Sequence, residues 1–193
     1  MCGIVCAFDL KQKAEILRPK VLEMSKKIRH RGPDWSGIYS GENAIMAHER
    51  LAIVDPTSGK QPLYSEDKKL VLAANGEIYN HLEIRGEIER DCKKKINWIS
   101  NTSDTETLIR AFEMWGTKET LKKCSGMFSI ALWDKSRKIL TLARDRFGEK
   151  PLYYGWQGNT FLFASELKAI KKHPNFASRI KTNSVSDFIQ FGY

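Results

Sequence analysis

A cysteine stands directly behind the initiator methionine, and this placement is the first feature that could carry chemistry. Removal of Met1 would turn the backbone nitrogen of Cys2 into a free α-amine. Because an α-amine titrates at about 7.7 to 8.0 and an ordinary thiol at about 8.5, such an amine can act as the base for its own thiol. The sequence therefore suggests an N-terminal nucleophile. The alternative is a cysteine that merely begins the apolar strand "GIVCAF".

A thiol that attacks an amide also needs hydrogen-bond donors where the oxyanion develops. In the stretch "LVLAANGEIYNH", the side-chain amide of Asn75 and the backbone N–H of Gly76 are candidates for these donors. Asn-Gly between two apolar runs is, however, the strongest short-range signal for a β-hairpin turn. Local evidence alone favours the hairpin, and the two interpretations are compatible.

An amino-acid substrate would further need a cation for its carboxylate and an anion for its ammonium group. Arg50, which opens the apolar stretch "RLAIVD", can pair with a carboxylate through two parallel hydrogen bonds. An ordinary surface arginine is the alternative. Asp104 and Glu77 are candidates for the ammonium group, although an aspartate at the position of Asp104 also serves simply as a helix cap.

The cysteines and histidines show no spacing that is typical of a metal site. Cys6 is expected to be a buried strand residue, and all four cysteines are expected to be reduced. Each histidine is expected to be structural: His30, His48, His81 and His173. Neither GxxxxGK[ST] nor a strand followed by GxGxxG occurs, so no phosphate loop for ATP is encoded. We expect no metal and no cofactor in this chain.

Composition is typical of a single globular domain in the cytoplasm. The chain has 193 residues, of which 41% are hydrophobic and 28% charged, and no apolar run is long enough to span a membrane. The formal charge of +9 raises the question of nucleic-acid binding. Its most compact lysine run, Lys93–Lys95, lies in a polar stretch that is typical of a solvated loop, so we expect neither a nucleic-acid nor a membrane partner.

Apolar periodicity indicates which elements must position these residues. Leu17, Val21, Met24 and Ile28 recur at helical spacing, which predicts a helix that starts near Pro19. "HRGPDWSG" is expected to be a loop because Gly-Pro marks a turn. Further helices are predicted over 101–116, where Ser103 and Glu106 have capping-box spacing and Gly116 would end the helix, and over 165–172. Strands are predicted over 3–8, 36–40, 44–54, 69–74, 127–134, 138–145, 151–156 and 160–165.

Two blocks of strands with helices between and after them indicate an α+β fold with helices covering mostly antiparallel sheets. Aromatic residues gather in the second block and alternate along its strands, which favours core packing over a base-stacking surface. These are Phe147, Tyr153, Tyr154, Trp156, Phe161 and Phe163.

Taken together, these stretches resemble the N-terminal glutaminase domain of the glutamine-hydrolysing asparagine synthetases, which are class II glutamine amidotransferases. The resemblance covers nearly the whole chain. "HRGPD" and "NGEIYNH" are its most discriminating motifs, because the hexosamine-forming branch typically has a tyrosine after the HRG glycine and lacks EIYNH. The motifs occur in family order: "MCGIV", "RHRGPDWSG", "HERLAIVDPTSGKQPL", "NGEIYNH", "SDTETL", "GMFSIALWD", "ARDRFGEKPLYY" and "FASELKAI".

This resemblance implies a four-layer αββα N-terminal-nucleophile hydrolase sandwich of two mostly antiparallel sheets. It implies that Cys2, freed of Met1, attacks the side-chain amide of glutamine and releases ammonia. Carried over by position, Arg50 would hold the substrate carboxylate and Asn75 with Gly76 would form the oxyanion hole. Glu77 and Asp104 would hold the substrate ammonium group. The backbone of Leu51, Ala52, Ile53 and Val54 would line the pocket.

The family's synthetase half, which uses ATP, magnesium and aspartate, has no counterpart in this sequence. We therefore expect an amidotransferase domain over 1–185 and the start of the passage to an absent synthetase domain over 186–193. Asparagine formation would belong to the parent protein. The stretch "LEIRGEIERDCKKKINWISNT" is longer and more basic than usual, and it is also similar to relatives in surface-polysaccharide synthesis, where a sugar acid would accept the ammonia.

Two questions stay open at the level of sequence. A catalytically idle module that binds glutamine or a partner domain is an alternative to an active glutaminase. The sequence also leaves open the ammonia acceptor and whether the protein forms a homodimer.

Overall fold

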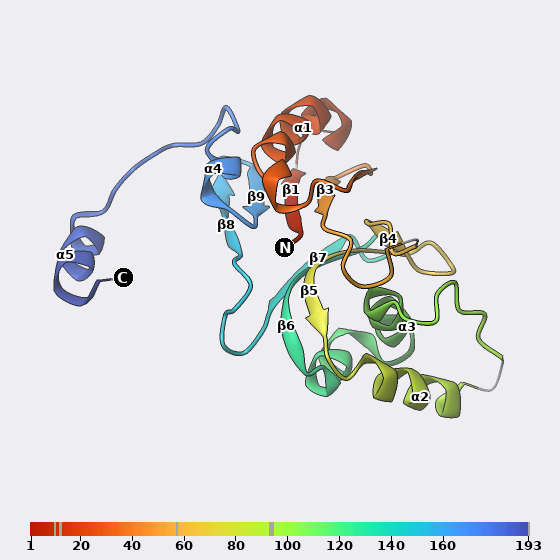
Figure 1. Cartoon of the computed structure of the whole chain (residues 1–193). Helices are drawn as coiled ribbons and strands as arrows, with labels where there is room; N and C mark the ends of the chain where they lie inside the picture. The colour runs from red at the N-terminus through yellow and green to blue at the C-terminus, as the bar shows by residue number, and fades with distance from the viewer. Residues whose placement is uncertain (10, 12, 57, 93–94, 193) are drawn as a thin grey trace.

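Two antiparallel sheets lie face to face, with helices on both outer sides (Figure 1). The computed structural model describes residues 1–9, 11, 13–56, 58–92 and 95–192. Lys93 and Lys94 of the predicted lysine loop lie outside these ranges, and Lys95 is exposed. Within the described chain, no helix has the length and apolar character needed to cross a membrane.

The first sheet, sheet A, has five strands in the order β2-β3-β1-β9-β8. The N-terminal strand β1 lies at its centre, where it pairs with β3 on one side and β9 on the other. The chain order of its strands is β1 (Gly3–Asp9), β2 (Trp35–Ser40), β3 (Ala44–Arg50), β8 (Tyr153–Gln157) and β9 (Thr160–Ala164). Since β1 is central, the backbone just before it is held in a fixed position.

The second sheet, sheet B, has four strands in the order β4-β5-β6-β7. These are β4 (Leu63–Tyr64), β5 (Leu70–Ile78), β6 (Gly126–Asp134) and β7 (Ile139–Arg144). The long pair β5 and β6 forms its centre, with Asn75 opposite Ser129 and Gly76 opposite Phe128.

Helices cover the outer face of each sheet. Sheet A carries α1 (Arg18–Lys26) and α4 (Leu167–Ile170), with the short 3₁₀ helices η1 (Ala14–Leu17) and η2 (Arg29–Arg31) beside α1. Sheet B carries α2 (His81–Asp91) and α3 (Asp104–Lys123). The predicted four-layer αββα sandwich is confirmed.

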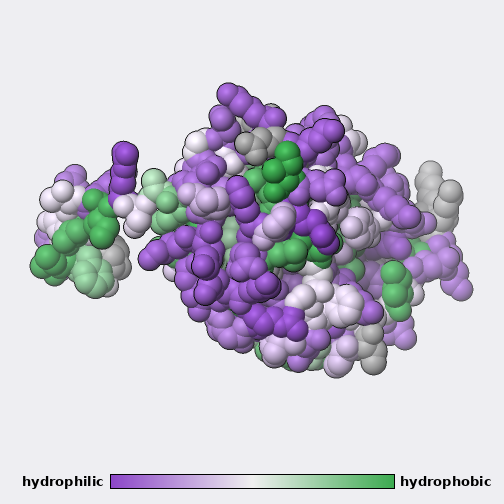
Figure 2. Space-filling view, turned by 90° about the horizontal axis from the view of Figure 1, so that it is seen from above, coloured by the Kyte–Doolittle hydropathy of each residue, from purple (hydrophilic) through white to green (hydrophobic). Residues whose placement is uncertain are grey.

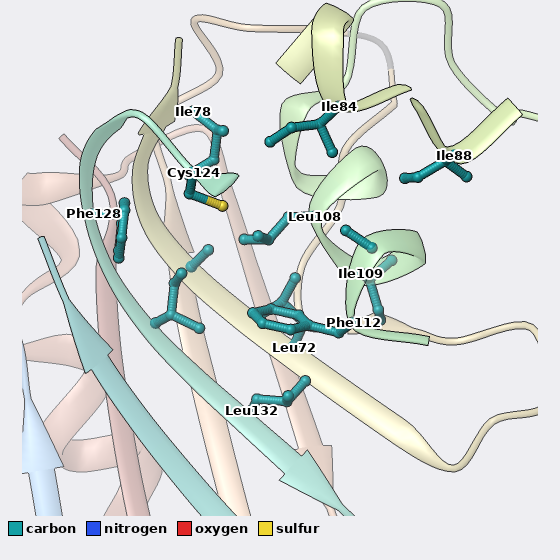
Figure 3. Close-up of a cluster of buried hydrophobic side chains, with 13 residues drawn as sticks. Leu72, Ile78, Ile84, Ile88, Leu108, Ile109, Phe112, Cys124, Phe128 and Leu132 are labelled. Atoms are coloured by element: carbon teal, nitrogen blue, oxygen red, sulfur yellow. The ribbon is translucent and has the colours of Figure 1, made fainter. Parts of the chain in front are cut away.

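Three apolar cores hold the layers together, and strand alternation decides which side chains enter each. In β1, Val5 and Ala7 face the helices of sheet A, whereas Ile4 and Cys6 face sheet B. The core between sheet B and its helices is the third (Figure 3), with Leu72, Leu108, Phe112 and Phe128 among its members. Cys6 is fully buried, as predicted.

The same alternation sends a polar residue into the layer between the sheets at the end of three strands. Ile4 and Cys6 of β1 share their parity with Cys2, and Val71 and Ala73 of β5 share theirs with Asn75. In β3, the side chains of Ala44 and Met46 enter this layer. Arg50, an even number of residues further along the same strand, lies on the same face. The inter-sheet core is therefore apolar along its length and polar at one end.

Several predicted elements need correction at their ends. The predicted loop "HRGPDWSG" contains η2 and the start of β2, because the backbone from Trp35 onward pairs with β3. The strand predicted over 44–54 ends at Arg50, where the chain leaves the sheet. Helix α2 was not predicted. The predicted start of α1 near Pro19 is confirmed.

Gly116 interrupts helix α3 without ending it. Its φ of 72° and ψ of 177° are non-helical, and helical structure resumes up to Lys123. The predicted capping box is half formed. The Ser103 hydroxyl accepts a hydrogen bond from the Glu106 N–H at 3.1 Å, but the Glu106 carboxylate accepts from Ile99 and Ser100 instead.

The prediction that the aromatic cluster packs in the core is wrong for most of its members. Phe163 is fully buried, but Phe147 is 90% exposed and Trp156 is 52% exposed. Trp156 lies opposite Phe161 on the face that Phe163 directs toward sheet B, so sheet B does not extend over edge strand β8.

The C-terminal helix α5 (Thr182–Phe191) is amphipathic and exposed throughout. Figure 2 shows hydrophobic side chains on the segment at the left, which corresponds to α5 in Figure 1. The boundary predicted between residues 185 and 186 falls inside this helix and stays a prediction.

Candidate active site

The polar end of the inter-sheet layer opens into a cavity of about 100 Å³. Its wall combines the N-terminus, the loop after β3, the end of β5 and the first turn of α3. The residues predicted to act on a substrate that line it are Cys2, Arg50, Leu51, Ile53, Val54, Asn75, Gly76, Glu77 and Asp104. Ala52 is the exception and does not line the cavity. Its N–H donates instead to the Asp34 carboxylate at 2.8 Å.

The sulfur of Cys2 is held against the loop that follows β3. It accepts a hydrogen bond from the Leu51 N–H at 3.4 Å, and the thiol faces the Leu51 carbonyl at 3.6 Å. Burial raises the pKa of the Cys2 thiol, while the Leu51 N–H, the N-terminal charge and Arg50 act in the opposite direction. The thiol is thus protonated at rest and needs a base before it can attack.

Arg31 fixes the backbone of Cys2, a role that sequence reasoning missed. Its Nε donates to the Cys2 carbonyl at 2.9 Å, and its guanidinium also binds Glu166 at 3.1 Å. Glu166 also pairs with His30 and Lys168. The motifs "RHRGPD" and "FASELKAI", 135 residues apart, therefore meet behind the nucleophile.

Arg50 is buried and organises the loop that follows it. Its guanidinium donates to the carbonyls of Val54 at 3.2 Å, Asp55 at 2.5 Å and Pro56 at 3.5 Å. These bonds hold the 51–56 loop around the cavity. Arg50 thereby places a permanent positive charge at the wall of the cavity that contains Cys2.

Asn75 and Gly76 do not form the hairpin turn that local sequence favoured. Both lie inside β5, where the long pairing with β6 overrides the turn preference of Asn-Gly. Gly76 has a φ of 155°, and a Cβ there would lie 2.0 Å from the Met127 carbonyl oxygen. Glycine is required at this position because β6 leaves no room for a side chain.

Asn75 is 1% exposed, and neither its side-chain carbonyl oxygen nor its amide nitrogen has a hydrogen-bond partner among the residues that the structure describes. An unsatisfied buried amide costs about 1 to 3 kcal/mol. Such a group is most easily explained by a ligand that completes its hydrogen bonds. The amide lines the cavity that contains the Cys2 thiol.

Gln61 and His48, which were not predicted to belong to the site, fix the strand beneath Asn75. The Gln61 side chain accepts from the Ala74 N–H at 2.7 Å and donates to the Ala74 carbonyl at 3.2 Å. His48 Nε2 lies 3.0 Å from the same carbonyl and joins the two sheets. Burial lowers the pKa of His48 to about 4, so it is a neutral structural residue, as predicted.

Asp104 faces the end of β5 and does not cap its helix, because Ser103 is the N-cap. Its carboxylate accepts a hydrogen bond from the Ile78 N–H at 3.0 Å. Burial raises the pKa of Asp104, with backbone hydrogen bonds acting against this. Together with Glu77, it supplies the acidic side of the cavity.

Further residues complete the wall. Met1 lies in the cavity in front of Cys2, and Lys150 donates to its sulfur at 3.2 Å. Gly59, Thr105 and Met127 also line the wall. The signal that could have found Lys150 is its place in "ARDRFGEKPLYY", one of the stretches on which the family resemblance rests.

A family model described as a glutamine amidotransferase domain matches residues 1–193. The chain belongs to this family. It is 46% identical over 171 residues to asparagine synthetase B of Escherichia coli K12 and 43% identical over 172 residues to an asparagine synthetase of Zea mays, both named glutamine-hydrolyzing. Each comparison covers 88% of this domain, but only 30% and 28% of the relative. The amidotransferase domain spans less than a third of these relatives.

Two solved structures have the fold of this amidotransferase domain. One is the Bacillus subtilis glutamine phosphoribosylpyrophosphate amidotransferase, with a TM-score of 0.67 and 20% identity over 88% of this chain and 43% of that one. The other is described as the allosteric regulatory enzyme of purine biosynthesis, with a TM-score of 0.73 and 21% identity over 89% and 43%. The predicted N-terminal-nucleophile hydrolase fold is confirmed.

Proposed function

We propose that this domain hydrolyses the side-chain amide of glutamine with Cys2 as its nucleophile. Once Met1 is removed, the α-amine of Cys2 takes the thiol proton, directly or through a water, and the sulfur attacks the amide carbon. The carbon–nitrogen bond then breaks, and the nitrogen leaves as ammonia with the proton that the amine returns. Water hydrolyses the remaining γ-glutamyl thioester, which releases glutamate and regenerates the thiol.

The unpartnered amide of Asn75 is the observation that carries this proposal. An oxyanion hole needs donors that are in place before the reaction and that gain a partner as negative charge develops. Within the described part of the chain the Asn75 amide nitrogen has no hydrogen-bond partner, and Asn75 lines the cavity of Cys2. The Gly76 N–H would act as the second donor. We assign both residues to the oxyanion hole.

The charges around the cavity suit a free amino acid. Arg50 would bind the glutamine α-carboxylate, and the backbone of the 51–54 loop would contact its chain. Glu77 and Asp104 would bind the α-ammonium group. The cavity thus presents one cationic and one acidic side to a substrate that carries both charges.

We further propose that the ammonia serves an asparagine synthetase. The named relatives support this, and in such a parent protein a synthetase half would bind ATP, magnesium and aspartate. A sugar-acid amidotransferase of surface-polysaccharide synthesis is the second candidate, favoured by the basic stretch 82–102. A cytoplasmic location is supported by four free cysteines.

Replacement of the nucleophile tests the proposal. Cys2→Ala should abolish ammonia release from glutamine, with a loss of at least about 10³-fold. Cys92→Ala, which changes a cysteine at the end of α2, is the matched control and should retain activity. Full activity in Cys2→Ala, or an intact mass that shows complete retention of Met1 in active protein, would refute the mechanism.

A glutamine-mimicking diazo ketone distinguishes an active domain from an idle binding module. Covalent labelling confined to Cys2 indicates an assembled site. A protein that binds glutamine but is neither labelled nor active would instead be an idle module.

A further inference from the structure

Lys150 is a buried cation without an acidic partner in the described structure. Its side chain is 5% exposed, and the only hydrogen bond of its Nζ among the described residues goes to the sulfur of Met1 at 3.2 Å. No carboxylate of the described chain lies within 4.0 Å of Nζ. A thioether is a weak acceptor, so burial of this ammonium group is poorly compensated.

A tightly bonded loop between β7 and β8 holds Lys150 in this position. The Asp145 carboxylate accepts from the N–H groups of Phe128, Glu149 and Lys150 at 2.8 to 3.2 Å. Arg144 Nε donates to the Lys150 carbonyl at 2.6 Å. The loop is thereby anchored to β6 opposite Gly76, so Lys150 has a defined place at the cavity wall.

The Lys150 ammonium group lies close to the backbone nitrogen of Cys2, which becomes the N-terminus once Met1 is removed. Nζ touches the Met1 sulfur, which five covalent bonds separate from the Cys2 nitrogen. Standard bond lengths then place Nζ within about 10 Å of that nitrogen. Removal of Met1 takes away the hydrogen-bond partner of Lys150 and leaves its charge facing the newly formed amine.

Other charges surround this corner from every neighbouring element. The acidic groups are Glu77, Asp104, Asp145 and Glu149. The cations are Arg31, Arg50 and Arg144. The Asp145 carboxylate accepts from backbone N–H groups and the Asp104 carboxylate accepts from Ile78, and among the described residues neither forms an ion pair with Lys150 Nζ. Substitution of Lys150 alone removes none of these charged residues.

We propose that Lys150 is a positioning residue that acts through its charge: it favours the neutral, basic form of the Cys2 α-amine and the thiolate form of its side chain. A nearby positive charge disfavours an ammonium group and stabilises a thiolate. Both effects make the nucleophile available at lower pH. The proposal rests on the N-terminal-cysteine mechanism and adds a residue that sets its pH range.

Lys150→Met tests this by removing the charge while keeping an unbranched side chain. The rate constant for Cys2 labelling by the diazo ketone is measured from pH 5.5 to 9.5, together with kcat/KM for glutamine. In Lys150→Met, the acidic limb of both pH profiles should shift to higher pH by about 0.5 to 1 unit. This shift lowers the labelling rate constant and kcat/KM about 3- to 10-fold at pH 6. At pH 9 the rates should agree within about twofold. Lys150→Arg should restore the wild-type limb.

Lys135→Met is the matched control, because it removes the same charge from an exposed turn at the far end of β6. It should leave the profile unchanged. An unchanged limb in Lys150→Met overturns the proposal, and so does an equal loss at every pH, which a purely structural role would produce. Intact mass must show removal of Met1 in each variant.

Titration of the wild-type amine keeps the proposal testable if Lys150→Met does not fold. The N-terminal amine is followed by NMR through the ¹³Cα signal of Cys2 in protein labelled with ¹³C-cysteine, in the folded and the urea-unfolded state. The folded state should titrate at lower pH than the unfolded one, and an equal or higher pKa refutes the role of Lys150. If wild type shows neither labelling nor ammonia release, it is the proposed function that fails.

Discussion

The cavity around Cys2 and the outer edge of sheet A reverse the usual relation between polarity and burial. In the cavity, Asn75, Asp104 and Lys150 are at least 95% buried although all are polar. At the edge, Tyr154 and Trp156 of β8 are 67% and 52% exposed although both are aromatic. Both regions border the layer between the two sheets: Asn75 enters it from β5 of sheet B, and Tyr154 and Trp156 lie on the side of sheet A that is turned toward it. They differ in whether a second sheet covers them.

This difference shows that neighbours, not residue type, decide burial here. Sheet B covers the central strands of sheet A, so most side chains of that face are buried there, including the polar Arg50 at its end, while Phe8 and Phe161 are partly buried. Polar groups in such a place must be bonded or kept for a ligand. Beyond the edge of sheet B, the aromatic side chains of β8 contact Phe161 of the neighbouring strand but no strand of sheet B covers them, so they stay exposed.

The sharpest test of the comparison substitutes two aromatic residues on adjacent strands. Phe163→Ala should lower the free energy of unfolding by about 3 to 5 kcal/mol, because it opens a void between the sheets. Trp156→Ala should lower it by about 1 kcal/mol or less, since half of that ring is already in water. Urea titration measures both. Equal losses would mean that β8 is covered in solution and would end the comparison.

Asn75→Ala tests whether the unpartnered buried amide is kept for catalysis. Loss of one oxyanion donor should lower kcat about 10²- to 10³-fold with little change in KM. The folded protein should be no less stable, because the amide makes no hydrogen bond to any described residue that the substitution would remove. Asn159→Ala, in the exposed β8–β9 turn, is the control. Wild-type kcat in Asn75→Ala would contradict the assignment.

A smaller effect is expected behind the nucleophile, at Glu166. Partial burial alone would raise the pKa of Glu166, but Lys168, Arg31 and His30 together lower it to about 2. Its stabilising contribution is therefore complete above the ordinary value of 4.5 and is lost as pH falls toward 2. Glu166→Gln should reduce stability at pH 7 by about 1 kcal/mol.

The pH dependence of that difference is the measurement. Urea unfolding of wild type and Glu166→Gln between pH 7 and 2.5 should give curves that converge below about pH 4.5. Glu119→Gln, which removes an exposed carboxylate of α3, is the control. A constant difference down to pH 2.5 would show that the Glu166 charge does not stabilise the fold.

Much of the site was predictable because the strand pattern itself encodes it. Alternation in β1 and β5 puts Cys2 and Asn75 on the same faces as their buried apolar neighbours. The Asn75-Gly76 pair wrongly predicted a hairpin turn. Turn preference depends on neighbouring residues in the sequence, whereas the nine-residue pairing of β5 with β6 depends on a distant strand. Lys150 was missed because its place in "ARDRFGEKPLYY" marks it as part of a family stretch but does not show that its side chain reaches the cavity.

The sequence by itself determined the alternating strands, the residue types at their ends and the family to which the domain belongs. Local periodicity specifies the strands, and the ordered series of short motifs carries the resemblance to the family. Only the tertiary structure decided that the ends of β1, β3 and β5 meet, that sheet B stops short of β8, and that a lysine 149 residues from Met1 lies against the N-terminus. Burial and charge in a site depend on contacts between distant segments, which no local pattern contains.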